Sequence, residues 1–173
     1  MAGDPELDTG PGALPVLTFS DSVTFHVNDR EAFVFHIEAA HTDGDAAILF
    51  RGDNVIFAGD VVFNGLFPFI DLDNGGSVDG YIAGQQRLIA MADDETTIVA
   101  GHGPLASKAD VEKNLAVLID SQARVKALVD KGMGADDIVA ANPLAIVGLV
   151  FGNHPWLEVR RLRDPDVSHA FLV

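Results

Sequence analysis

Short apolar runs fill the first third of the chain, and their length and spacing predict a sheet of short strands. Residues 23–27 alternate apolar and polar positions with a period of two, which is typical of a strand. The sequence Arg51–Gly52–Asp53 is suited to a hairpin turn. The opening half is therefore expected to be mostly antiparallel sheet, followed by a long loop over residues 59–76. The predicted strands cover residues 15–19, 23–27, 32–37, 46–50 and 54–58.

Beyond this loop the apolar positions recur every three or four residues, which predicts amphipathic helices. Ser77 is suited to cap the first helix, and Ser107 with Asp110 forms the sequence pattern of a capping box at the second. A buried strand over residues 96–100 separates the two helices, and a short helix is expected over residues 136–141. Strands first and helices afterwards predict an α/β fold of layered α+β type.

Composition excludes several classes of protein. The 173 residues contain 26 acidic residues against 11 Lys and Arg, which gives a formal charge of −15 and a pI near 4.4. We therefore expect no nucleic-acid partner, because phosphate-backbone binding depends on Lys and Arg. No apolar run approaches the ~20 residues that span a bilayer, so no membrane partner is expected. The absence of Cys excludes disulfides, a thiolate zinc site and a Cys nucleophile.

Three residues are candidates for chemistry because each is predicted where a strand meets a loop, with a glycine nearby in the sequence. They are His41 in AAHTDGD, Asp60 in FAGD and His102 in AGHGP. Two imidazoles and a carboxylate suit Zn²⁺, Fe²⁺ or Mn²⁺ better than Ca²⁺. The alternative interpretation is that each is an ordinary loop residue.

Other motifs in the chain fail on their details. GHGPLA, at Gly101, Gly103 and Ala106, follows a predicted strand as a dinucleotide fingerprint would, but Pro104 fits poorly and no second strand ending in an acid follows. DLDNGG begins like a calcium loop but lacks its later ligands, and GGSVDG is not a nucleophile elbow.

The order HTDGD, then FAGDVVFNG, then GHGP resembles the second part of a metallo-β-lactamase-fold hydrolase. The resemblance implies an αββα sandwich, present here only in part, with one or two metal ions, usually zinc, at one edge of the sheets. It also implies that His41 is the third histidine of the first metal site and His102 the histidine of the second. Asp60 would be the catalytic carboxylate that bridges both metals, beside a metal-bound hydroxide that attacks the substrate.

The family's HxHxDH motif is absent, so the expected metal site is incomplete. Only His26 and His36 precede His41; His26 is expected on a strand surface, and His36 is a remote substitute for a ligand. We therefore expect a truncated chain. Its predicted organisation is a flexible tail (1–12), the C-terminal part of the domain (13–141) and an extension without structural assignment (142–173).

The resemblance to this family also implies a function, which is expected to be hydrolysis. A bridging Asp60 favours an ester, thioester or lactone hydrolase with a small-molecule substrate over a dedicated β-lactamase. Zinc is the expected cofactor, with iron or manganese as alternatives.

The other hypothesis is a non-catalytic remnant of the fold that serves as an association module and need hold no metal. A homo-oligomer or a complementing N-terminal segment would cover the exposed sheet. The resemblance favours a periplasmic or secreted location, although no signal peptide is visible.

Overall fold

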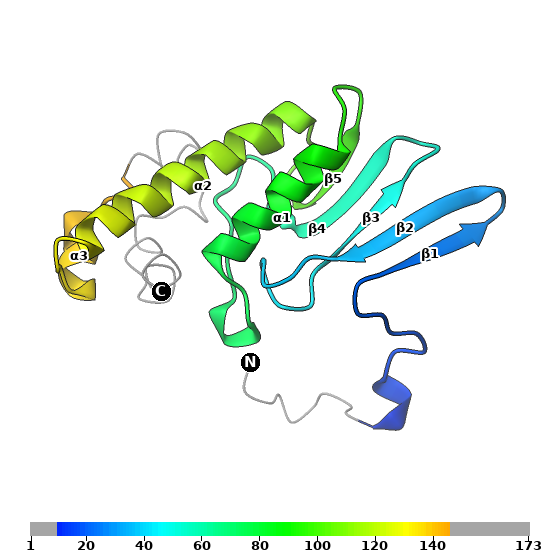
Figure 1. The fold of residues 1–173 in the computed structure, drawn as a ribbon, viewed down its shortest axis with the longest axis horizontal. Coiled ribbons are helices and arrows are strands. Elements are labelled where there is room, and N and C mark those ends of the chain that lie inside the picture. The colour runs from blue at the N-terminus through cyan, green and yellow to red at the C-terminus, as the bar shows by residue number, and fades with distance from the viewer. Residues whose placement is uncertain (1–9, 146–173) are drawn as a thin grey trace.

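The structure is a computed structural model that describes residues 10–145, and a five-stranded sheet lies at its centre (Figure 1). The strands follow one another in sequence order across the sheet. The first four are antiparallel neighbours, whereas β4 and β5 are parallel. A parallel pair needs a crossover connection, and the first long helix supplies it. The strands are β1 (Ser22–Val27), β2 (Arg30–His36), β3 (Ala46–Phe50), β4 (Val55–Phe63) and β5 (Thr97–His102).

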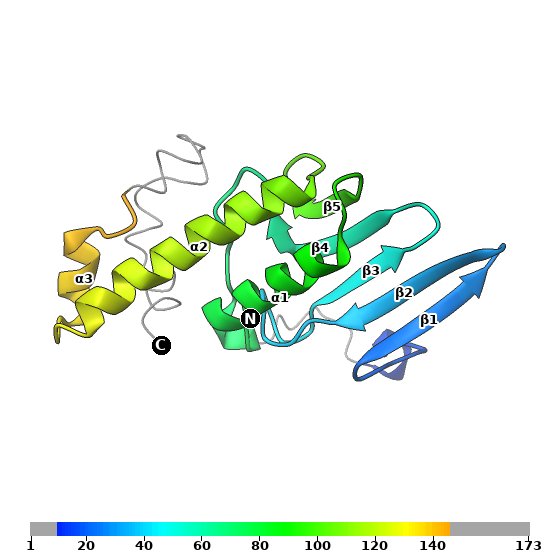
Figure 2. The same cartoon turned by 45° about the horizontal axis from the view of Figure 1, so that its top comes forward.

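Two long helices lie on the same side of the sheet, as Figures 1 and 2 show. The predicted cap of the first is confirmed: the Ser77 hydroxyl accepts a hydrogen bond from the Gly80 amide. The capping box of the second, between Ser107 and Asp110, is confirmed as well. The helices are α1 (Val78–Met91), α2 (Lys108–Val129) and α3 (Ala135–Ala141), with short 3₁₀ turns η1 (Pro11–Ala13) and η2 (Leu72–Asn74).

The core lies between this sheet and the two helices. Leu49, Ile56 and Ile98 come from three neighbouring strands, share one face and are fully or almost fully buried. Leu88 from α1 and Leu118 from α2 are buried in the same apolar cluster. The helix periodicity seen in the sequence is therefore explained by an apolar stripe on each helix: α1 packs on β4, and α2 packs against α1.

The opposite face of the sheet is also apolar but has no layer on it among the described residues. The cross-strand register aligns one residue from each strand in a continuous row. None of these side chains is buried, and Phe57 is 47% exposed. An antiparallel sheet with one face in water normally carries polar residues there, so this composition is typical of a covered face. We call this row the open face; it consists of Val23, Val34, Ile48, Phe57 and Val99.

Two predictions about elements are wrong. Residues 15–19 form no strand; Val16 and Leu17 are exposed, and Pro15 lacks the amide hydrogen that a strand pair needs. Strand β4 does not end at residue 58 but continues to Phe63, so the predicted loop 59–76 begins later. The extension exists because β5 continues to pair with β4 beyond that point.

Several sequence predictions fall on residues outside 10–145. The predicted tail lies mostly among residues 1–9, and most of the 142–173 extension is likewise not described. The apolar run over residues 144–151 predicts a buried element; Leu144 is buried, and most of the run lies beyond the described part. None of the helices between residues 10 and 145 is long and apolar enough to span a bilayer.

Candidate metal centre

Asp60 lies within β4, not at the end of a strand as the sequence suggested. The pairing of β4 with β5 is irregular between Phe57 and Phe63, which is the stretch that contains Asp60. Gly59 has φ of +53°, a left-handed conformation that favours glycine. A β-bulge changes the direction of the side chains next to it, so the Gly59–Asp60 sequence accounts locally for the placement of the carboxylate.

The structure brings the three candidate residues together. His41, from the loop after β2, places Nε2 3.6 Å from Asp60 Oδ2. His102, the last residue of β5, places Nε2 3.4 Å from Asp60 Oδ1. Each carboxylate oxygen therefore faces a different imidazole. The side chains form a gradient of exposure from His41 (17%) through Asp60 (37%) to His102 (55%), so the centre opens to solvent on the His102 side.

His41 is fixed through its other ring nitrogen. Nδ1 lies 2.8 Å from the Phe69 carbonyl oxygen. Because a carbonyl only accepts hydrogen bonds, Nδ1 must carry the proton and donate it. In the neutral ring Nε2 then holds a lone pair directed toward Asp60. The Phe69 ring contacts the imidazole edge-on at 5.8 Å and the Phe63 ring lies 6.2 Å away, which further restricts the ring. Histidines that bind metals are commonly oriented by such a hydrogen bond.

His102 is held by a ring contact and by its backbone. The Phe63 ring stacks on the imidazole with centroids 4.6 Å apart. The His102 carbonyl accepts a hydrogen bond of 2.9 Å from the amide of Asn64, the residue that follows β4. Phe63 therefore lies between the two histidines, in contact with both.

The other two histidines within residues 10–145 lie outside the centre. His36 Nε2 is 2.7 Å from the Asp43 carbonyl oxygen, so this ring closes the loop that carries His41 and does not substitute for a ligand. His26 is exposed on β1, as expected from the sequence.

The acidic turn supports the His41 loop. The Asp71 amide donates to the His41 carbonyl oxygen at 2.8 Å, and the Asn74 side chain donates to the Asp71 carboxylate at 2.7 Å. This hydrogen bond lowers the pKa of Asp71, which keeps the carboxylate ionised. The DLDNGG sequence thus closes a turn and braces the loop.

Sequence reasoning missed two buried polar residues of α1 near the centre. Gln85 donates from Nε2 to the carbonyl of Val61, the residue after Asp60, at 3.1 Å. Tyr81 is fully buried; burial and the nearby charges of Asp60 and Asp45 raise the pKa of its hydroxyl well above the usual value. The hydroxyl therefore stays protonated at neutral pH. The signal in the sequence was the i, i+4 spacing of two polar side chains on the buried side of a helix.

The donor set fits part of a two-cation site. Each of two positions would have one imidazole nitrogen and one carboxylate oxygen, and neutral imidazole with carboxylate suits Zn²⁺, Fe²⁺ or Mn²⁺. Zinc centres usually have three or more protein ligands. Within residues 10–145 no three His, Asp or Glu side chains form a complete cluster for one ion. The three residues would thus supply two donors for each position, fewer than a zinc centre usually has.

The described part of the chain is a five-stranded α/β sheet with helices on one face and two imidazoles on either side of a carboxylate. The metallo-beta-lactamase superfamily matches residues 2–102 of the chain. The chain therefore belongs to this superfamily. The matched region contains all three candidate residues and ends at His102.

Solved structures confirm the fold. A metallo-beta-lactamase from Pontibacter korlensis is 19% identical with a TM-score of 0.54, over 61% of this chain and 49% of its own. A metallo-beta-lactamase family protein from Thermus thermophilus is 19% identical with a TM-score of 0.59, over 90% of this chain and 48% of its own. The chain thus spans about half the length of each of these two structures. No curated protein matches.

Proposed function

We propose that this chain contributes His41, Asp60 and His102 to a metal-dependent hydrolase that acts on an ester, thioester or lactone. The observation that carries the proposal is that the two oxygens of Asp60 face two different imidazole nitrogens, at 3.6 and 3.4 Å. A carboxylate can bridge two cations because its oxygens present separate lone pairs, which one imidazole nitrogen cannot do. Superfamily membership supports the same reaction type.

In this proposal the residues around His41, Asp60 and His102 orient these three side chains toward the cation positions. His41 presents Nε2 because its Nδ1–H is bound to Phe69. Asp60 lies between the two rings, and each of its carboxylate oxygens would bind the cation next to one imidazole. A divalent cation bound there lowers the pKa of water so that hydroxide is available near neutral pH, and it polarises a substrate carbonyl. The exposed His102 side of the centre is where a small-molecule substrate would approach.

We further propose that a second half-domain, not contained in the 173 residues, supplies the remaining donors and covers the open face. Two observations support this: two donors per position are too few for zinc, and the chain spans about half of its structural relatives. The incomplete donor set and the uncovered open face both belong to the same sheet, so one half-domain could complete both. Without this half-domain the open face would pair with another copy of the chain.

A second candidate function is a non-catalytic association module of the same fold. The incomplete donor set in residues 10–145 favours it, because such a module need hold no metal. The open face would then be its functional surface. The two candidates differ in metal content.

Metal binding by the purified chain separates them. We expect about one equivalent of Zn²⁺ or Co²⁺ to bind weakly and to raise the melting temperature, because a ligand of the native state stabilises it by mass action. Asp60→Asn keeps the shape but removes the charge, so the metal-dependent shift should disappear. In a complete enzyme the same change should reduce turnover at least ~100-fold, as expected for the loss of a major electrostatic contribution.

The measurement compares the melting temperature of both forms in chelator and in excess zinc. His26→Gln, at an exposed strand histidine remote from the centre, is the matched control and should retain the zinc shift. If zinc affects the unmodified chain and Asp60→Asn equally, the proposed centre is wrong and the association module is the better function.

A further inference from the structure

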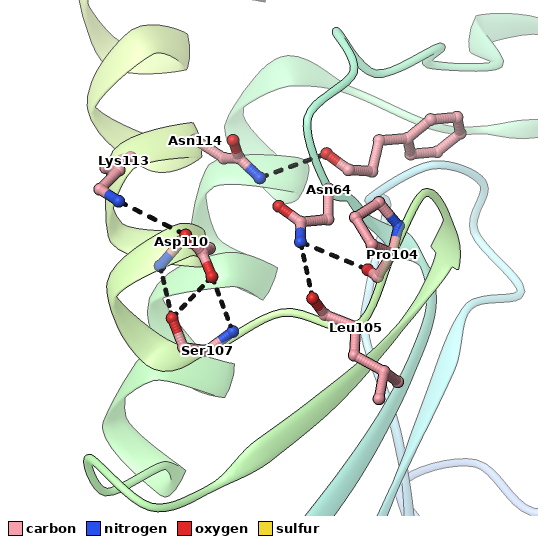
Figure 3. Close-up of polar contacts among 8 residues, drawn as sticks. Asn64, Pro104, Leu105, Ser107, Asp110, Lys113 and Asn114 are labelled. Atoms are coloured by element: carbon pink, nitrogen blue, oxygen red, sulfur yellow. Dashed lines mark hydrogen bonds and ion pairs between the residues drawn. The ribbon is translucent and has the colours of Figure 1, made fainter.

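Asn64 connects the end of β4 to the loop that follows His102. Its side-chain Nδ2 donates to the carbonyl oxygens of Leu105 at 3.0 Å and Pro104 at 3.3 Å (Figure 3). Its backbone amide donates to the His102 carbonyl oxygen at 2.9 Å. Three carbonyls of one short segment are therefore bound by a single residue. Because the Pro104 and Leu105 carbonyls can only accept, the two side-chain hydrogen bonds require a donor side chain at residue 64, and they fix the orientation of its amide.

The segment after His102 packs closely against the backbone of Asn64. Gly103 has φ of +91°, and a Cβ there would overlap the backbone of Asn64. Beyond Leu105, Ala106 exchanges two 2.8 Å backbone hydrogen bonds with Ile98, and Ser107 begins the capping box of α2. The loop is thus held at both ends and in its middle.

A second side-chain amide, on helix α2, binds the end of β4 next to Asn64. Asn114 of α2 is almost fully buried and donates from Nδ2 to the Phe63 carbonyl at 3.2 Å (Figure 3). Phe63 in turn stacks on the His102 ring. The orientation of the His102 imidazole is therefore restricted by stacking on Phe63 and by the hydrogen bond from Asn64 to the His102 backbone. The His102 side chain is nevertheless more than half exposed.

We propose that Asn64 is a positioning residue for His102: it fixes the Gly101–Leu105 segment so that the His102 ring stacks on Phe63 with Nε2 toward Asp60. This inference rests on the proposed function for its role in metal binding. The positioning itself is a property of the metal-free chain and is tested separately. Polar partners outside the ligand sphere of a metal commonly change affinity 10–100-fold when removed.

Asn64→Ala and Asn64→Asp test the proposal. Alanine removes the side-chain donors, and aspartate keeps the shape but places oxygens against two carbonyls. Stacking on Phe63 shifts the His102 proton resonances, so we expect both variants to lose this ring-current shift in the NMR spectrum of the metal-free chain. The resonances of His41 should remain. If the chain binds Co²⁺, its affinity should fall about 10-fold or more.

The matched control lies at the other end of the same strand. Asn54 precedes β4 and also makes two side-chain hydrogen bonds, to Asp93 and Thr96. Asn54→Asp should lower the melting temperature as much as the Asn64 variants but leave the His102 resonances and the Co²⁺ affinity unchanged. The control therefore distinguishes a general loss of stability, which both sites would show, from a change at His102, which only the Asn64 variants should show.

Unchanged His102 resonances in a folded Asn64→Ala chain would overturn the proposal. Should neither Asn64 variant fold, the unmodified chain decides: nuclear Overhauser contacts between the Asn64 side-chain amide and Leu105 support the proposal, and their absence refutes it. If the unmodified chain binds no Co²⁺, the proposed metal function fails, while the ring-current measurement still decides whether Asn64 positions His102.

Discussion

Gly101 lies directly against the carboxylate of Asp60. A Cβ at this position would overlap Asp60 Oδ1 and the backbone of Gly59, which are parts of the neighbouring strand. The absence of a side chain at residue 101 therefore allows β5 to approach the bulge of β4 and leaves the carboxylate its place between the two imidazoles. The requirement is steric, because the obstruction arises from space and not from an unusual backbone angle.

Gly101→Ala should lower the free energy of unfolding by about 1–3 kcal/mol, as overpacking does, and should abolish any metal-dependent rise in melting temperature because Asp60 is displaced. Urea denaturation and thermal melts with and without zinc measure the two effects. Gly52→Ala is the control, since a Cβ there meets no atom within 4 Å; its cost should stay within ~0.5 kcal/mol. Equal behaviour of the two variants would contradict the role of Gly101.

The sequence identifies the three central residues but not those that place them. His41, Asp60 and His102 stand out because an imidazole or a carboxylate is predicted at the end of a strand with a glycine nearby in the sequence. Asn64 and Gly101 act through the register of β4 against β5, which is a tertiary property. An asparagine that follows a strand, such as Asn64, can have many ordinary roles, so its residue type alone did not indicate that it contacts the segment after His102.

At the scale of elements, helix starts were predictable and strand ends were not. Ser77 and the Ser107–Asp110 pair satisfy the free amides of a helix locally, so the signal lies within four residues. Strand β4 continues beyond residue 58 because its partner is β5, far away in the chain. The Gly59 that suggested a strand end instead marks a bulge within the strand.

The cap of α2 predicts a pH dependence of stability. The Ser107 hydroxyl and amide donate to the Asp110 carboxylate, and these hydrogen bonds lower its pKa in the folded chain. The unfolded chain therefore takes up the proton first as pH falls below about 4. The stabilisation by the ionised carboxylate is complete above that pH and is lost as pH falls through the lower pKa of the folded state.

Asp110→Asn should accordingly reduce the free energy of unfolding by about 0.5–1 kcal/mol at pH 7, the usual contribution of an acid in the first turn of a helix. The difference from the unmodified chain should shrink as the pH is lowered toward 3. Denaturation curves at a series of pH values measure it. Asp94→Asn, in an exposed turn before β5, should show a smaller change at pH 7; a constant Asp110→Asn deficit at every pH would contradict the assignment.

At the scale of the whole molecule the open face decides how the chain behaves in solution. Its apolar row crosses all five strands and contains no charge, although the chain has a net charge of −15. Apolar area left in water costs ~25 cal/mol per Å², and strand β1 adds an unpaired edge within the described sheet. We expect the isolated chain to self-associate at micromolar concentration.

Phe57→Asp places a charge in the middle of the open face and should shift sedimentation from dimers or larger species to monomer. Ile119→Asp is the matched control, because Ile119 on α2 is 45% exposed against 47% for Phe57 but belongs to the helical side. It should leave the association unchanged. A compact, cooperatively unfolding monomer of the unmodified chain would contradict both the self-association and the proposed need for a covering half-domain.

The parallel pairing of β4 with β5 has a consequence for the order of folding. The four antiparallel strands are joined by short connections and form with little loss of loop entropy. Asp60 meets His102 only after the crossover through α1 has closed, which is a later and slower event. Because β4, α1 and β5 must all be in place, the three candidate residues come together only after the crossover has formed. The proximity of Asp60 to His102 therefore reports on whether the sheet and its crossover have folded together.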